Sequence, residues 1–125
     1  MDINKTDQLP STWIKLTRIA SVKGYNCPEA DEQFWASMEL DELVNKDPDE
    51  ALGIILEILN QDPDQIILAN LSAGPLEDLL VRHGEEVIER IETEAKHNKA
   101  FKLLLGGVWQ NKMKEDIWLR IQKIK

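Results

Sequence analysis

Two helix-start signals with the same pattern stand 15 residues apart, and they constrain the fold more than any other feature of the chain. Asp47-Pro48-Asp49-Glu50 and Asp62-Pro63-Asp64-Gln65 each place Asp at the N-cap, Pro at the first helical position and Glu or Gln at the third. The Asp carboxylate accepts hydrogen bonds from unpaired backbone N–H groups, and Pro has no N–H to leave unpaired. The spacing leaves about three helical turns and a tight connection. We therefore expect short helices that pack as antiparallel neighbours.

The helix expected between these two starts is apolar around most of its circumference. Only a narrow strip through Gly53, Glu57 and Asn60 is polar or small. Such a helix is expected at the centre of the core, because a surface helix exposes a wide polar face. We expect nearly complete burial of Leu52, Ile55, Leu56 and Leu59.

Helix signals continue along most of the remaining chain. Ser11 is a predicted N-cap and Gly24 a predicted end of a first helix, and Pro28 suits the first turn of a second. Gly74-Pro75 is predicted to end one helix and to start a short one that ends at Gly84. Further helices are expected to open at Glu85, Asn98 and Glu115. The predicted fold is all-α: a compact bundle of about seven short helices, with HEAT-like stacked helical pairs, in a single domain over residues 1–125.

Charge is unevenly distributed along the chain, whose net charge is −8. Residues 26–94 carry 19 acidic and 3 basic side chains, a balance of −16, whereas residues 1–25 sum to +2 and residues 95–125 to +6. An acidic middle segment can attract a basic partner, or the basic ends can neutralise it within the molecule. The net charge argues against nucleic acid as a partner. The apolar runs are too short for a membrane span, and no secretory signal is expected.

Residues that could bind a metal or act as a nucleophile are few. Glu94 and His97 form one half of a Glu-x-x-His di-metal motif, and the sequence lacks the second half. Cys27 is the one cysteine, and the acidic residues that follow it would raise the pKa of its thiol. A single cysteine also fits a reducing compartment, so we expect a cytoplasmic protein. We expect no metal site, no cofactor and no catalytic residue.

His83 has a structural and a functional interpretation. It directly precedes Gly84, where a cation in the last turn of a helix interacts favourably with the helix dipole. Alternatively, His83 could form a general acid–base group with Glu77, Asp78 or Glu86. The structural interpretation predicts a helix junction, with Asp78 paired to Arg82 one turn later.

The helix that opens at Glu85 carries the most distinctive expected surface. Glu85, Glu89 and Glu92 lie at positions i, i+4 and i+7 and form one acidic ridge opposite an apolar stripe. We expect this acidic ridge, together with Glu77 and Asp78, to bind Lys or Arg residues of a partner. Two local ion pairs are predicted to moderate it, Glu86–Arg90 and Glu92–Lys96.

Three tryptophans are further candidates for binding. Tryptophan is enriched at the energetic centres of interfaces, but it also anchors small cores. The apolar pattern around Trp35, Trp109 and Trp118 favours the edge of the core for each.

The run Gly74-Pro75-Leu76-Glu77-Asp78-Leu79-Leu80, followed by Arg82-His83-Gly84, resembles a bacterial family known only as a domain of unknown function. The resemblance extends through Ile88-Glu89-Arg90-Ile91-Glu92 and Leu105-Gly106-Gly107-Val108-Trp109, and covers about residues 34–121. It implies a small all-helical protein and assigns no catalytic residue.

Small acidic helical proteins also resemble, as a class, the immunity proteins of bacterial toxin systems, which bind and block a toxin. The leading hypothesis is a non-catalytic, monomeric binding protein whose basic partner is a cognate toxin domain. The alternatives are a helical adaptor or regulator without a toxin partner, and an enzyme that uses Glu77, Asp78 and His83.

Overall fold

The computed structural model describes residues 5–124, and within them the chain is all-α with no β-strand, as predicted. None of the helices in this part of the chain is both long enough and apolar enough to cross a membrane. The elements are α1 (Lys5–Lys23), α2 (Pro28–Gln33), α3 (Trp35–Lys46), α4 (Pro48–Gln61), α5 (Gln65–Leu71), a π-helical turn η1 (Ser72–Leu76), α6 (Glu77–His97), α7 (Lys99–Leu105) and α8 (Glu115–Ile124).

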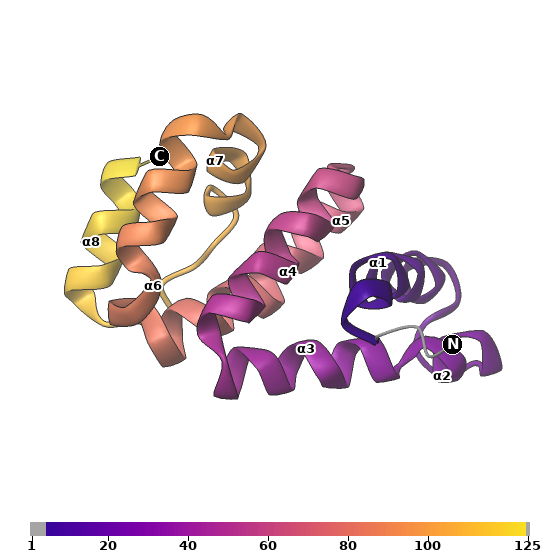
Figure 1. Cartoon of the computed structure of the whole chain (residues 1–125). Coiled ribbons are helices and arrows are strands. Elements are labelled where there is room, and N and C mark those ends of the chain that lie inside the picture. Colours follow the sequence, from indigo (N-terminus) through magenta and orange to yellow (C-terminus); the bar gives the residue numbers. More distant parts are fainter. Residues whose placement is uncertain (1–4, 125) are drawn as a thin grey trace.

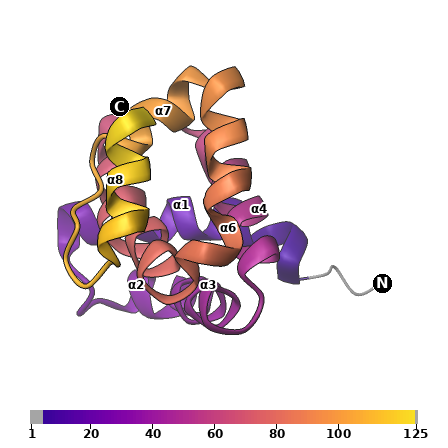
Figure 2. The ribbon, with the colours of Figure 1, turned by 90° about the vertical axis from the view of Figure 1, so that its left-hand side faces the viewer.

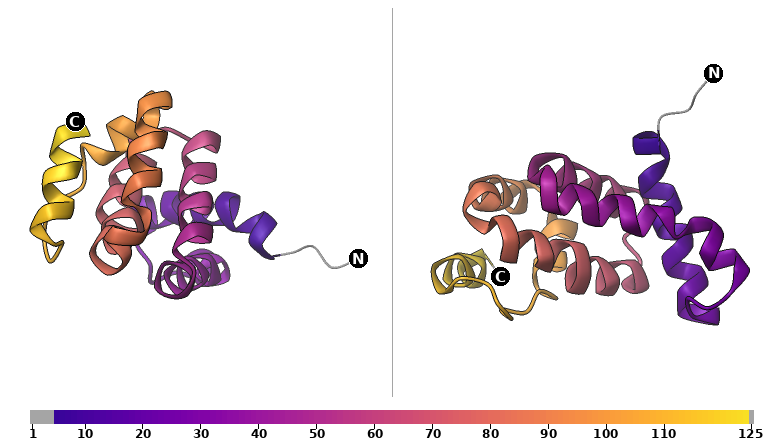
Figure 3. Two further views of the ribbon diagram at one scale, coloured as in Figure 1. Left: turned by 60° about the vertical axis from the view of Figure 1, so that its left-hand side comes forward. Right: turned by 90° about the horizontal axis from the view of Figure 1, so that it is seen from below.

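Helix α4 runs through the middle of the molecule (Figure 1). Helices α1 and α3 pack against it, and so do α6 and α7. Helix α8 packs against α6 and forms the outermost layer (Figure 2; Figure 3, left). As a result α2 and α8 lie at opposite ends of the molecule (Figure 1).

The predicted start at Asp47 is confirmed, and the predicted start at Asp62 is displaced by two residues. The Asp47 side chain accepts a hydrogen bond from the Glu50 backbone N–H, which caps α4. The N-cap of α5 is Asp64 instead of Asp62. Asp62 ends α4 and binds Arg18 of α1 through its carboxylate, so a long-range ion pair occupies the predicted capping group.

The first two predicted helices also differ from the structure at their ends. Helix α1 begins at Lys5 and contains Pro10, and Ser11 is not its N-cap, because its hydroxyl donates to the Gln8 carbonyl. Gly24, with a φ of 77°, ends α1 as expected. The helix predicted from Pro28 is interrupted at Phe34, which separates α2 from α3.

The predicted break at residue 74 is a distortion within continuous helical structure, whereas the one beside Gly84 is a kink between two helical segments. Pro75 lies in η1, where the wider π turn accommodates a residue that cannot donate a backbone hydrogen bond. The two segments of α6 meet at His83, whose φ and ψ of −136° and 29° are not helical, so the helix boundary predicted there is confirmed as a kink. Gly84 also allows close packing, because a Cβ there would lie 3.1 Å from the Ile117 side chain of α8.

The core centres on α4, as its apolar circumference predicted. Leu52, Ile55 and Leu59 are buried. The prediction for Leu56 is wrong, because this side chain is only partly buried and packs at the edge of the core. Ile58 is fully buried in its place, so the buried face is rotated slightly from the one predicted.

Candidate functional site

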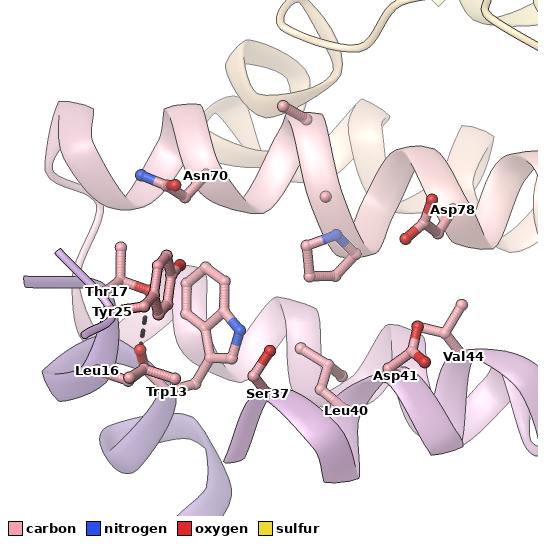
Figure 4. Close-up of a pocket in the computed structure, with 13 residues that line it drawn as sticks. Trp13, Leu16, Thr17, Tyr25, Ser37, Leu40, Asp41, Val44, Asn70 and Asp78 are labelled. Carbon is pink, nitrogen blue, oxygen red and sulfur yellow. Dashed lines mark hydrogen bonds between the residues drawn. The ribbon is translucent and has the colours of Figure 1, made fainter. Parts of the chain in front are cut away.

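A cavity lies between α1, α3 and the continuous α5–η1–α6 segment (Figure 4). Its volume is about 330 Å³. One wall is apolar and aromatic: Trp13 and Leu16 come from α1, and Leu40 and Val44 come from α3. These four side chains are buried in the core, so they hold this wall rigidly.

Tyr25 stands at one end of the cavity, near Trp13 (Figure 4). Its ring makes an edge-to-face contact with Phe34, with centroids 6.3 Å apart. Thr17 and Asn70 also line this region, but their side chains donate hydrogen bonds to backbone carbonyls of their own helices. The aromatic end is thus formed by the largely buried ring of Trp13 and the exposed ring of Tyr25.

The other end of the cavity is acidic. Asp41 of α3 and Asp78 of α6 lie across from each other there (Figure 4). Burial raises the pKa of the Asp78 carboxyl, and the charge of Arg82 opposes this effect, while Asp41 and Glu77 add to it. Arg82 lies 3.4 Å from the Asp41 carboxylate, so the predicted Asp78–Arg82 ion pair is wrong. A positively charged group entering the cavity would relieve the cost of burying Asp78.

The residues of the Gly-Pro-Leu-Glu-Asp run divide between two faces of the fold. Gly74, Pro75 and Asp78 line the cavity. Glu77 is buried on the other side, where its carboxylate accepts hydrogen bonds from the Trp109 backbone N–H at 3.2 Å and the Asn111 side chain at 3.1 Å. The prediction that Glu77 lies on a partner-binding surface is therefore wrong, because its buried carboxylate binds the α7–α8 loop.

His83 is a structural junction in this fold. Its Nε2 lies 2.9 Å from the Asn45 carbonyl oxygen near the end of α3, and its Nδ1 lies 3.0 Å from Glu86. The hydrogen bond to Glu86, followed by that to Asn45, raises the pKa of the imidazole. Both partners accept hydrogen bonds, so the protonated ring satisfies both. Among the described residues no hydrogen bond or ion pair joins Glu77, Asp78 and His83 to one another, since Glu77 binds the α7–α8 loop and His83 binds Asn45 and Glu86.

Two cations near the C-terminus pair with most of the predicted acidic ridge, Lys114 in the loop before α8 and Arg120 in α8. Glu85 accepts a hydrogen bond from Lys114 at 2.8 Å. Glu92 binds Arg120 through two nitrogens, at 2.9 and 2.5 Å, and this contact lowers the pKa of the Glu92 carboxyl. Glu89 is exposed and makes no ion pair among the described residues. Two of the three ridge carboxylates are therefore neutralised within the molecule.

The local ion pairs predicted along α6 are also replaced by longer-range contacts. Glu86 binds His83, and Arg90 donates to the Asp49 backbone carbonyl at 2.9 Å. Lys96 acts on Glu92 only through space, since Arg120 occupies its carboxylate.

The remaining acidic surface is concentrated on α2, α3 and the start of α4. Residues 28–50 carry nine acidic and one basic side chain, a balance of −8. Exposed apolar groups lie among them, with Phe34 at 41% and Met38 at 64% exposure. We call residues 28–50 the acidic end. Asp41 belongs both to the acidic end and to the cavity, so the two are continuous.

The three tryptophans singled out in the sequence have different environments. Trp35 and Trp118 pack at the edge of the core, as expected. The prediction for Trp109 is wrong, because this residue is 76% exposed. Gly106 and Gly107 end α7, and the loop then turns Trp109 outward while Glu77 fixes its backbone. Gly107 is needed for this packing, because a Cβ there would lie 2.6 Å from the Ser72 hydroxyl oxygen.

The sequence predicted Asp78 as a partner-binding residue at a packed helix junction, and the structure places it at a cavity that the sequence did not predict. Trp13, Tyr25 and Asp41 were not predicted as site residues, and Asp41 is one of many carboxylates in the chain. The Gly74-Pro75 pair was the available signal, since the π turn it forms borders the cavity. Among residues 5–124, no three His, Cys, Asp or Glu side chains are grouped so that they could hold a metal ion.

No curated protein and no solved structure is significantly similar to the chain. The sequence profile of a family of unknown function, DUF6869, matches residues 23–125. The matched residues include α2 to α8, whereas most of α1, which supplies Trp13 and one wall of the cavity, precedes them. The chain belongs to this family, DUF6869.

Proposed function

We propose that the protein is a non-catalytic binding domain for a basic protein partner, and that the cavity at the acidic end accepts a Lys or Arg side chain of that partner. The observation that carries this proposal is the continuity of an acidic, partly apolar surface with a cavity that has carboxylates at one end and aromatic rings at the other.

The acidic end supplies attraction at a distance. Its balance of −8 equals the net charge of the whole chain, because the other charges cancel. A surface of one sign raises the association rate with an oppositely charged protein and loses this effect with added salt. Exposed Phe34 and Met38 lie within it and supply apolar contact area once the partner arrives.

The cavity supplies specificity. The aliphatic part of a Lys or Arg side chain can lie against the aromatic end, at Trp13 and Tyr25, while its charged group reaches Asp41 and Asp78 at the other end. A volume of about 330 Å³ accommodates a long side chain and water. Cationic side chains inserted into aromatic pockets are frequent energetic centres of interfaces.

The more specific form of this proposal is a cytoplasmic immunity protein that binds and neutralises a cognate toxin domain. The acidic surface and the small helical fold support it by analogy with that class. A helical adaptor with a basic, non-toxin partner is the alternative. A toxin gene directly upstream favours immunity, whereas an unrelated operon favours the adaptor.

The cavity is tested with a capped Gly-Arg-Gly peptide, titrated into ¹⁵N-labelled protein. We expect saturable shifts of the Trp13 indole N–H and of the backbone amides of Ser37 and Gly74. Asp78→Asn should weaken binding several-fold, because it removes the carboxylate whose burial a cation would offset. Binding should also weaken as the pH falls through the raised pKa of Asp78.

The matched control is Glu89→Gln, which removes one exposed carboxylate outside the cavity. It should leave the peptide affinity unchanged. Equal weakening by Asp78→Asn and Glu89→Gln would show that the peptide senses only net charge and would contradict the proposal. Shifts confined to backbone amides outside the cavity, with the Trp13 indole unaffected, would do the same.

A further inference from the structure

A second cavity lies beside α8, which is at the opposite end of the molecule from α2 (Figure 1). It has a volume of about 380 Å³ and is bordered by α6, α7 and α8. Four of its lining residues are basic, and one is acidic. The lining residues are Glu92, Ala95, Lys96, Lys102, Arg120, Lys123 and Ile124.

The positive charges around this cavity exceed what is needed to balance its one carboxylate. Arg120 binds Glu92 through two nitrogens and is thereby fixed in orientation. Lys96 and Lys123 lie close enough to lower the pKa of the Glu92 carboxyl, after the larger effect of Arg120. Within residues 5–124, neither lysine makes an ion pair, and neither does Lys102. Four cations and one anion leave a local balance of +3 in a chain of net charge −8.

Helix dipoles explain only part of this arrangement. Lys96, Lys102 and Lys123 lie in the last turns of α6, α7 and α8, where a cation is favourable. That effect acts on each helix separately and does not require the three side chains to surround one cavity. Where three such helix ends converge, their lysines repel one another, and a bound anion would reduce this repulsion.

We propose that this basic cavity binds a compact anion that carries two or more phosphate groups. Three separate helices present cations around a concave site, which suits a compact ligand more than an extended strand. On the neighbouring α6 surface the carboxylate of Glu89, which makes no ion pair among the described residues, would repel the continuing backbone of a nucleic acid. Ala95 and Ile124 form an apolar wall that can contact an uncharged part of the ligand.

Inorganic tripolyphosphate is the probe, and isothermal titration calorimetry of the full chain is the measurement. We expect one saturable site whose affinity falls steeply with added salt, and a rise of the unfolding midpoint with ligand. The variant Lys102→Ala, Lys123→Ala should bind at least tenfold more weakly. Inorganic phosphate should bind more weakly than tripolyphosphate, because it reaches fewer of the cations.

The matched control removes two exposed lysines that do not line the cavity, Lys99→Ala and Lys112→Ala. It changes the net charge equally and should keep the parent affinity. Equal losses in both double variants would show diffuse attraction and overturn the proposal, as would the absence of saturable binding at low salt. Tighter binding of a single-stranded RNA oligonucleotide than of tripolyphosphate, lost in the cavity variant, would also overturn it in favour of a nucleic-acid site.

Discussion

The acidic end and the basic cavity have opposite charges, and the acidic ridge between them is largely neutral. At the acidic end, four of the nine carboxylates form ion pairs, with Lys23, Lys46, Arg82 and Arg90, and the other five form none among the described residues. At the basic cavity, three lysines have no ion-pair partner in the described part of the chain. Along the ridge, Lys114 and Arg120 bind Glu85 and Glu92. The difference shows that a charged stretch of sequence leaves a free charged surface only where the fold does not pair its side chains.

The two ends are joined by elements that contact both. Helix α4 packs against α1 and α3 near the acidic end and against α6 and α7 on the way to the basic cavity. His83 joins α3 to α6 through the Asn45 carbonyl. If the two ends unfold as one cooperative unit, a destabilising substitution in these elements must lower the stability of both ends.

The largest expected effect comes from Ile55→Ala in α4. Ile55 is fully buried, so the substitution removes apolar contacts and leaves a cavity, at a cost of about 2–5 kcal/mol in the free energy of unfolding. Denaturant titration followed by circular dichroism and by tryptophan fluorescence should give one coincident transition. Leu56→Ala is the control, and it should cost clearly less because Leu56 is only partly buried. Separate transitions would mean that the two ends unfold independently.

A smaller effect is expected from Glu77→Ala, which acts on the α7–α8 loop alone. The substitution leaves the Trp109 N–H and the Asn111 amide without their acceptor and should cost about 1–3 kcal/mol. Hydrogen exchange at the Trp109 amide should become faster, while exchange in α3 should not change. Glu89→Ala on the same helix should do neither. An undisturbed Trp109 amide in the Glu77 variant would show that the loop is held by other contacts.

Sequence reasoning was most successful where structure depends on neighbouring residues. The caps at Asp47 and Asn98 and the end of α1 at Gly24 were predictable because each needs only a few adjacent residues. The apolar circumference of α4 also located the core, with an error of one position at Leu56.

Predictions failed where a distant residue changed the outcome. Asp62 was available as a cap until Arg18, 44 residues earlier, bound its carboxylate. Arg82 and Arg90 had acidic neighbours one turn away and bind Asp41 and Asp49 instead. At the cavity, Asp78 stands in the Gly-Pro motif, whereas Trp13 and Asp41 acquire their role only when α1 and α3 are brought together.

The third prediction concerns pH and the junction at His83. The folded-state pKa of this imidazole is raised above its ordinary value of 6.5. Its contribution to stability is therefore fully present below pH 6.5 and is lost as the pH rises through the folded-state value. The free energy of unfolding should fall over this interval in the parent and less steeply in His83→Gln. His97→Gln, the control at the end of α6, should keep the parental dependence of the free energy of unfolding on pH. Equal slopes in the parent and His83→Gln would show that the His83 hydrogen bonds do not stabilise the junction.

The smallest expected effect separates the two ion pairs of the ridge. Glu92 and Arg120 form a two-nitrogen contact and are partly shielded, at 30% and 40% side-chain exposure, whereas Glu85 and Lys114 are more exposed and share one contact. A double-mutant cycle with Glu92→Gln and Arg120→Gln should therefore show measurable coupling, and one with Glu85→Gln and Lys114→Gln should show less. Because the pKa of Glu92 is lowered in the folded state, its coupling should be present above its ordinary value of 4.5 and disappear as the pH falls through the folded-state pKa. Added salt should reduce the exposed pair first. Equal coupling in the two cycles would mean that Lys114 and Arg120 neutralise the ridge through their charge alone. The two-nitrogen geometry of Arg120 beside the basic cavity would then add no stability.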